Sequence, residues 1–592
     1  MIANLTDDRS SLLQFVRQHN LTRLLLLAAL GLLLAGCSTP ATQPPASPAT
    51  AGTINQPPAA LPAKPEQAFD TSALEAVTST ALTDGTLAAR IQRNEILARG
   101  LDATTLTLIN ARLAWLDGEI ERARALLDEA STSNIEGREL LLAERQSMAQ
   151  AQRQWLRAAR LAWQRSKLST GEALANRQED IFTNLLRLGE QPLRRAAVSA
   201  ADSEWSGWIT LAEAYRKGRN SVLGWLERNP GHRAIDAPPV GLSLWLTQRP
   251  PKQLAVLLPL SGRLQQAGEA VLDGLVRGLY EQYQDPDARP ALMTIDTETI
   301  SDASTAYRNA VSAGADFVIG PLTREQVQSA IRARQRPVPQ LALNRPAAAL
   351  PDDTENWAAI SLSPEDEAAQ IAELAFGDGL RRAMIVRPAS DWGRRLESAL
   401  VNRWRSLGGL VVDVAEIDSQ TPASKTISET LGAANSEARI RAMEDAFVAP
   451  VSARARRRGD FDVLFLLAPD PGTARELRPL LVFHYAGDVP VYSPASVYSG
   501  NRRARNQDLN GLHFVEIPAV LDAAEIDRFT RLRALGRDAV TLLDHWEQTQ
   551  ASDRAPVFGG SGVLRRFPDG NVQRELTPTF FDGDTIRRTP LR

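Results

Sequence analysis

From Gln253 onward, short apolar runs alternate with segments that carry a helical pattern of apolar residues. This alternation constrains the fold more than any other feature of the chain. The first run, Gln253 to Leu260, is followed by Ser261-Gly262 and then by a helical pattern from about Leu264 to Tyr283. Short apolar runs bounded by Gly or Pro are typical of buried strands. Strands that alternate with helices predict a parallel sheet with helices on its faces.

The alternation continues in two similar series, which predict two α/β lobes in tandem. In the first series we expect strands at 291–295, 315–320 and 338–344, and helices at 303–313 and 323–334. In the second we expect strands at 358–362, 382–387, 410–417, 461–468 and 489–493, and helices at 364–376, 392–407 and 473–484. The tail adds a strand at 512–517, helices between 523 and 545, and a hairpin at 562–581 that turns at Asp569-Gly570.

The segment from about Ala68 to Gly241 has helical spacing of apolar residues and little alternation of period two. Its clearest unit runs from Leu108 to Ala130 and carries small residues at Gly118 and Ala123. Gly118 permits a turn between two helices, and the alanine lets neighbouring helices approach closely. This pattern resembles the helix-turn-helix of a tetratricopeptide (TPR) repeat. A plain helical bundle is the alternative.

The N-terminus has the order of a secretory signal: basic residues, an apolar run from Leu24 to Leu34, and then Ala35-Gly36-Cys37. The run has about eleven residues, whereas a membrane-spanning helix needs roughly 20. This stretch resembles the lipobox of bacterial lipoproteins, which implies that residues 1–36 are removed and that Cys37 is acylated. Ser38 after the cysteine implies sorting to the outer membrane. Residues 37–66 are rich in Pro and Ala, which predicts a linker.

Composition excludes several kinds of function. The net charge is -3, which gives no general electrostatic reason to bind nucleic acid. Cys37 is the only cysteine, so no disulfide can form within the chain. The five histidines stand apart, without ligand spacing, and the sequence contains neither a nucleophile elbow nor a phosphate loop. We therefore expect no catalytic residues, no metal site and no cofactor.

Two tandem α/β lobes in an exported protein resemble the type I periplasmic binding fold. In relatives that bind small ligands, polar residues after the first strands contact the ligand, as expected at the carboxyl ends of parallel strands. That resemblance implies candidate ligand contacts at Ser261, Thr323, Asn344 and Asp391. The alternative is local: Ser261 and Thr323 would cap helices, and Asn344 and Asp391 would be turn residues.

The most specific stretch lies in the second series. A basic run, Arg454, Arg456, Arg457 and Arg458, precedes the strand at 461–468. The stretch Phe483-His484-Tyr485-Ala486-Gly487-Asp488 begins at the end of the helix at 473–484. The arginines could dock an acidic partner surface or the anionic cell wall, or they could form a solvated loop. Together with the lipobox and the two halves of the chain, this stretch is similar to the penicillin-binding protein activator lipoproteins, the LpoA (LppC) family.

The resemblance implies an outer-membrane lipoprotein that faces the periplasm and is not an enzyme. It would bind a class A penicillin-binding protein, a bifunctional peptidoglycan synthase, and stimulate transpeptidation. Peptidoglycan is a further candidate partner. The alternative hypothesis is a tethered solute-binding or sensing protein with a small ligand between its lobes. The expected organisation is a signal peptide at 1–36, a lipidated linker at 37–66, a helical TPR-like domain at 67–247 and a binding-protein-like α/β domain at 250–592.

Overall fold

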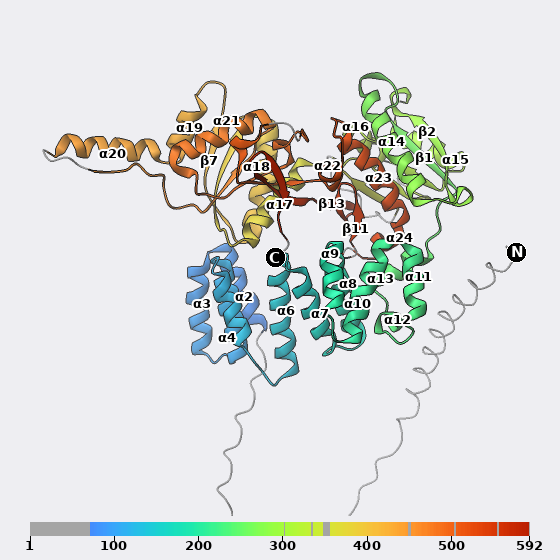
Figure 1. Ribbon diagram of the computed structural model, residues 1–592, viewed down its shortest axis with the longest axis horizontal. Coiled ribbons are helices and arrows are strands. Elements are labelled where there is room, and N and C mark those ends of the chain that lie inside the picture. The colour runs from blue at the N-terminus through green and yellow to red at the C-terminus, as the bar shows by residue number, and fades with distance from the viewer. Residues whose placement is uncertain are drawn as a thin grey trace, which may run out of the picture. The chain divides into compact units, whose positions relative to one another are not determined.

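The computed structural model describes residues 71–592 except 301, 333–334, 347–355, 448–451, 502–504, 553, 555 and 591–592. The predicted signal peptide, Cys37 and the linker lie outside these residues. The first part of the described chain is helical (Figure 1). Its helices are α2 (Thr71–Thr83), α3 (Thr86–Ala98), α4 (Ala103–Leu116), α5 (Ile120–Glu129), α6 (Ile135–Ala151), α7 (Trp155–Ser166), α8 (Gly171–Leu186), α9 (Glu190–Val198), α10 (Ser203–Lys217), α11 (Arg219–Arg228), α12 (Arg233–Asp236) and α13 (Val240–Thr247).

The unit predicted from Leu108 to Ala130 forms the helix pair α4 and α5. Asp102 starts α4 by accepting a hydrogen bond from the backbone N–H of Thr105. Gly118 lies in the turn with a φ of 81°, a left-handed conformation that favours glycine. Ala123 is fully buried, which allows the close helix approach that its small size predicts.

The first α/β lobe is built on an eight-stranded sheet of order β11-β12-β13-β5-β4-β3-β1-β2. Strands β1 to β5 pair in parallel, and Leu254 to Leu258 of β1 are completely buried, as a strand covered on both faces requires. Its elements are β1 (Gln253–Leu258), η1 (Gly262–Leu264), α14 (Gln265–Gln282), η2 (Pro286–Ala288), β2 (Ala291–Asp296), η3 (Thr297–Thr299), α15 (Ala303–Ser312), β3 (Phe317–Ile319), α16 (Arg324–Ala330), β4 (Gln340–Ala342), β5 (Trp357–Ile360), α23 (Thr530–Asp544), α24 (Trp546–Ala551), β11 (Val557–Gly559), β12 (Gly562–Arg566) and β13 (Asn571–Glu575).

The second lobe has a seven-stranded sheet of order β15-β14-β10-β9-β8-β6-β7. Its central strands are parallel, and β14 and β15 are antiparallel at one edge. Its elements are α17 (Pro364–Gly377), β6 (Arg382–Pro388), α18 (Asp391–Ser406), β7 (Leu410–Ile417), α19 (Ala423–Thr430), α20 (Ala433–Ala446), β8 (Val463–Leu466), α21 (Pro471–Leu481), η4 (Val482–Ala486), β9 (Val491–Ser493), η5 (Ala495–Val497), η6 (Gln507–Leu509), β10 (Leu512–Glu516), α22 (Pro518–Asp522), β14 (Thr577–Asp582) and β15 (Thr585–Arg588).

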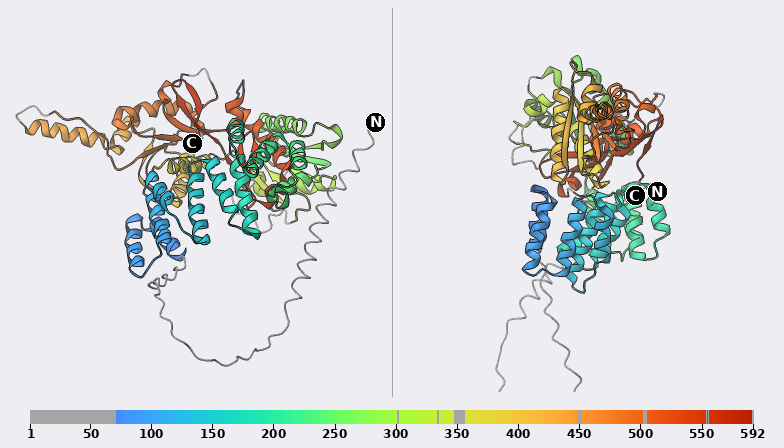
Figure 2. Two further views of the ribbon diagram at one scale, coloured as in Figure 1. Left: turned by 60° about the horizontal axis from the view of Figure 1, so that its bottom comes forward. Right: turned by 90° about the vertical axis from the view of Figure 1, so that its left-hand side faces the viewer.

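The predicted fold class, a helical N-terminal part followed by a two-lobed α/β domain, is confirmed. The hairpin expected at 562–581 is confirmed over 562–575, as the antiparallel pair β12 and β13, whereas 577–581 belong to β14 of the second sheet. The chain does not complete the first lobe before it begins the second. After the second lobe has started, β13 returns to pair in parallel with β5 of the first sheet, and β14 then pairs with β10 of the second. Helices α19 and α20 were not expected, and α20 projects away from the rest of the lobe (Figure 1 and Figure 2).

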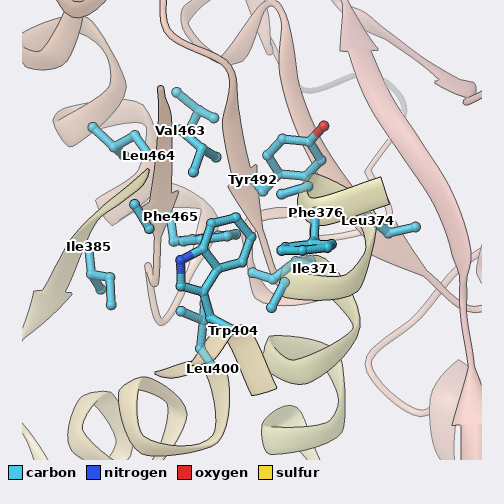
Figure 3. Packing of buried hydrophobic residues seen from close by; sticks show 14 of the residues in the cluster. Ile371, Leu374, Phe376, Ile385, Leu400, Trp404, Val463, Leu464, Phe465 and Tyr492 are labelled. Carbon is cyan, nitrogen blue, oxygen red and sulfur yellow. The ribbon is translucent and has the colours of Figure 1, made fainter. Parts of the chain in front are cut away.

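The core of the second lobe surrounds Trp404 of α18 (Figure 3). The Trp404 ring lies edge-on to Phe376 of α17 and to Phe465 of β8, with centroid distances of 5.8 Å and 5.3 Å. The same hydrophobic cluster includes Trp115 of α4, whose ring is 6.4 Å from that of Phe376. Apolar packing therefore joins the helical part to the second lobe.

The chain passes between the lobes after β5, after β10 and after β13, and buried charges gather there. Glu516, at the end of β10, is fully buried and forms an ion pair with Arg531 of α23. Glu367 of α17 lies 3.9 Å from Arg574 of β13. Burial raises the pKa of Glu516 to about 7, although Arg531 opposes this shift. The ionised form of Glu516 is therefore disfavoured in the folded protein.

This buried carboxyl gives a prediction for stability against pH. Because the folded pKa of Glu516 exceeds its ordinary value of 4.5, its contribution to stability is complete below that pH and is lost as the pH rises through about 7. Relative to Glu516→Gln, the free energy of unfolding of the wild-type chain should fall by up to about 3 kcal/mol between pH 4.5 and 8. Urea unfolding at a series of pH values measures this difference. Glu373→Gln on α17, which removes a carboxylate that is 40% exposed, is the matched control. The prediction is contradicted if the free energy of unfolding depends on pH in the same way for the wild-type chain and for Glu516→Gln.

Candidate partner-binding surface

The C-terminal end of α21 turns three apolar side chains toward solvent. Helix α21 continues into the wider turn η4, in which His484 and Tyr485 leave helical geometry. Tyr485 has a φ of 67°, a left-handed conformation that costs a non-glycine residue about 1–2 kcal/mol. His484 is buried, and its Nε2 lies 2.9 Å from Oγ of Ser424 on α19. This backbone places the histidine inward and the residues on either side of it outward.

We call Val482, Phe483 and Tyr485 the Phe483 patch. Phe483 is 72% exposed, Val482 is 50% exposed and Tyr485 is 42% exposed. Large apolar side chains that gather in solvent at adjacent positions are typical of protein-binding surfaces. The Phe483 ring lies 4.9 Å from the ring of the buried His484, and most of its surface faces solvent. The patch is therefore a candidate surface for contact with another molecule.

The basic run contacts the end of the motif at 483–488, which contains most of this patch. Arg457 forms an ion pair with Asp488 at 3.1 Å, which joins the two sequence motifs in space. Its guanidinium also lies 4.9 Å from the centroid of the Phe461 ring. The hydrogen bond from Arg457 lowers the pKa of Asp488, so this carboxylate is ionised at neutral pH. The structure therefore brings together two motifs that the sequence separates.

The four predicted arginines divide into two pairs. Arg458 contacts Asp413 at 2.9 Å and Asp460 at 2.7 Å, and Arg457 is engaged as described above. Arg454 and Arg456 are exposed, and within the described part of the chain no carboxylate forms an ion pair with either. Their role in docking an acidic partner or the cell wall stays a prediction, in which Arg454 and Arg456 are the available cations.

The predicted ligand contacts occupy both lobes. Ser261, Thr323 and Asn344 follow β1, β3 and β4, which are neighbours in the first sheet, so they share one sheet edge. Asp391 follows β6 in the second lobe and is exposed, with an ion pair to Arg394 at 2.6 Å.

Each of these side chains makes a local contact. The Ser261 hydroxyl donates to Asp296 and lowers the pKa of that carboxyl. Thr323 caps α16 by accepting from the N–H of Gln326 at 3.4 Å, and Asn344 donates to the carbonyl of Leu322 at 3.1 Å. Their assignment as ligand contacts stays a prediction.

Sequence reasoning named the Phe-His-Tyr motif but did not identify Val482 and Phe483 as surface residues. A signal was available in the apolar stripe of α21. Its buried residues include Ala474, Leu477 and Leu481. Helical spacing continues this stripe to about position 484 or 485 and leaves 482 and 483 outside it.

Within the described ranges, no three or more His, Cys, Asp or Glu side chains are grouped so that they could hold a metal ion. The search for membrane-spanning helices covered the same residues, and none of their helices is both long and apolar enough.

The fold and this surface together define a class: a two-lobed α/β protein with a helical N-terminal part and an exposed aromatic patch. The chain belongs to the LppC putative lipoprotein family, whose profile matches residues 105–583. The predicted resemblance is thereby confirmed.

Among curated proteins, the chain is similar to the penicillin-binding protein activator LpoA of Photobacterium profundum, with 28% identity over 436 residues, 69% of this chain and 70% of that protein. Among solved structures it is similar to full-length LpoA from Haemophilus influenzae, with 20% identity, a TM-score of 0.47, and coverage of 89% of this chain and 99% of that chain. The C-domain of that protein, described as a regulator of PBP1A, has 21% identity and a TM-score of 0.45 and covers 57% of this chain and 100% of that domain.

Proposed function

We propose that this chain is an outer-membrane lipoprotein that binds a class A penicillin-binding protein and stimulates peptidoglycan synthesis by transpeptidation. The names of its curated relatives support the activator role. The observation that carries a binding function, in preference to catalysis, is the Phe483 patch, where backbone strain accompanies the exposure of aromatic side chains. The chain itself would perform no reaction and would need no cofactor.

The proposal includes the organisation expected from the sequence. Cys37 would carry the lipid, residues 37–66 would span the distance from the membrane, and the helical domain at 67–247 would precede the α/β domain at 250–592. The α/β domain would make the contact with the synthase, in the periplasm.

Activation requires that the chain bind one conformation of the synthase more tightly than another, because a partner shifts an equilibrium only by its differential affinity. A coupling free energy of about 1–3 kcal/mol is typical of such regulation. Aromatic side chains that enter pockets of a partner contribute most to interfaces of this kind. Phe483 and Tyr485 are the proposed anchors.

The prediction that tests this function replaces both anchors, as Phe483→Ser with Tyr485→Asn. Asparagine tolerates the left-handed conformation at position 485, so the turn should be retained. Removing two anchors should cost about 2 kcal/mol of binding free energy, which is about 30-fold in affinity for the purified synthase. Binding by biolayer interferometry and cross-linking of lipid II product are the two measurements.

The matched control is Leu87→Ser on α3, where the leucine is 74% exposed and lies in the helical part. It should bind and stimulate like the wild-type chain. A wild-type chain that neither binds nor stimulates the synthase would refute the proposed function. A double variant with unchanged affinity would refute only the assignment of the contact to the Phe483 patch.

The solute-binding hypothesis is the second proposal. It is supported by the shared sheet edge at which Ser261, Thr323 and Asn344 lie. We place it second because each of these side chains already forms a local hydrogen bond.

A further inference from the structure

A cavity of about 400 Å³ opens in the helical part, far in sequence from the Phe483 patch. It lies between the end of α5, helix α6 and the end of α7. Helices α6 and α7 pack side by side (Figure 1). Cavities that hold small ligands or a few residues of a peptide have volumes of roughly 300–1,000 Å³. This cavity is therefore large enough for a specific ligand.

The lining of the cavity is apolar where it is buried. Leu141 and Leu142 are buried, and Leu168 is partly buried. Ser131, Thr132 and Gln164 add hydroxyl and amide groups to the same lining. Such groups donate to and accept from peptide bonds, so the lining suits a peptide that inserts an apolar side chain.

The charged part of the lining has one sign. Arg138, Arg145 and Lys167 line the cavity, and no Asp or Glu does. Arg145 is already engaged, because it donates to the carbonyls of Leu127 and Ala130 at the end of α5. That arrangement neutralises the negative end of the α5 dipole beside the cavity.

Arg138 and Lys167 are the two cations that remain available. Both are exposed, and among the residues that the structure describes no carboxylate forms an ion pair with either. The Lys167 ammonium lies 3.4 Å from the centroid of the Trp163 ring, which holds it in place by a cation–π contact. Two cations, one of them held against Trp163, beside an apolar, hydrogen-bonding cavity complement a ligand that combines carboxylates with apolar side chains.

We infer that this cavity binds an acidic peptide segment of a protein partner, with one apolar side chain between Leu141, Leu142 and Leu168 and with carboxylates against Arg138 and Lys167. The inference concerns the helical part and does not depend on the proposed contact between the α/β domain and a synthase.

The test measures binding to the full chain by fluorescence anisotropy. The probe is a short fluorescein-labelled peptide of alternating glutamate and leucine. This peptide should bind saturably, and its affinity should fall as the salt concentration rises, because exposed charges are screened. A peptide of alternating lysine and leucine should not bind, and one of alternating glutamate and serine should bind at least fivefold more weakly. Equal binding of the glutamate and lysine peptides, or no saturable binding of either, would overturn the inference.

Variants locate the site. Arg138→Glu with Lys167→Glu should weaken binding of the glutamate–leucine peptide at least tenfold. Arg194→Glu with Lys217→Glu makes the same change of net charge on α9 and α10, outside the cavity lining, and should leave the affinity unchanged. An equal loss in both variants would show attraction by net charge alone and would refute the site.

A soluble peptidoglycan stem peptide, which also carries carboxylates, is the competing occupant. If it displaces the probe at lower concentration than the unlabelled probe peptide does, the assignment to a protein partner is wrong.

Discussion

Replacing Trp404 by alanine should lower the free energy of unfolding by about 3–5 kcal/mol, which is enough to unfold many domains of ordinary stability. The Trp404 side chain is completely buried and lies between the rings of Phe376 and Phe465 (Figure 3). Its indole N–H donates to the carbonyl of Leu410 at 3.1 Å. The substitution removes apolar burial, leaves a cavity and breaks this hydrogen bond. Urea unfolding of the full chain, followed by far-ultraviolet circular dichroism, measures the loss.

Trp392→Ala is the matched control for this substitution. Trp392 lies on the same helix, α18, but is only partly buried against the same cluster. It should cost clearly less, because part of its surface is already in water. If both variants lose the same stability, the central position of Trp404 in the core of the second lobe does not have the energetic weight that we assign to it.

The sequence predicts the two α/β series well because each element carries its own local pattern. The strand at 410–417 coincides with β7, and the helix expected at 392–407 is α18 displaced by one residue. A buried strand bounded by turn residues, followed by an amphipathic helix, is identifiable without any long-range information. The turn at Asp569-Gly570 could be predicted for the same reason, because its signal lies in adjacent residues.

Pairing between distant segments could not be predicted in this way. Nothing in the pattern of Asn571–Glu575 shows that β13 pairs in parallel with β5. Helix α20 was missed because most of its residues are exposed, so its sequence lacks a continuous apolar stripe. Hydrophobic periodicity reports burial, and an element with little burial gives little signal.

The candidate site shows the same limit. The motif at 483–488 resembles that of a known family, but the left-handed backbone of Tyr485 could not be predicted, because local rules disfavour it for tyrosine. Places where sequence rules fail in this manner are often functional. The pairing of Arg457 with Asp488 depends on the tertiary fold and was likewise invisible in the sequence.

Arg381 connects the helical part to the second lobe through backbone carbonyl groups. It directly precedes β6, and its guanidinium is buried at the end of α4. It donates to the carbonyls of Leu116 at 3.0 Å and of Trp115, and on its own side to those of Phe376 and Leu380, both at 2.7 Å. The last carbonyls of a helix have no partner within the helix, so this side chain caps α4 from another domain.

Replacing Arg381 by methionine should cost about 2 kcal/mol or more of unfolding free energy, since the carbonyls of Leu116 and Leu380 lose their donor and each buried carbonyl left without one costs about 1–3 kcal/mol. The carbonyls of Trp115 and Phe376 keep the backbone N–H groups of Gly118 and Gly379 as donors. Burial lowers the pKa of Arg381 only to about 10, so the guanidinium is charged at neutral pH and the loss should not vary between pH 6 and 8. Urea unfolding at both pH values measures the loss.

Arg382→Met is the matched control, because the adjacent Arg382 side chain is 48% exposed and contacts Asp462 at 3.7 Å. Partly exposed ion pairs contribute about 0–1 kcal/mol, so this control should stay close to the wild type. If the two variants are equally stable, the carbonyl groups of α4 do not depend on Arg381, and the other contacts, among them the apolar contact between Trp115 and Phe376, hold the helical part to the second lobe.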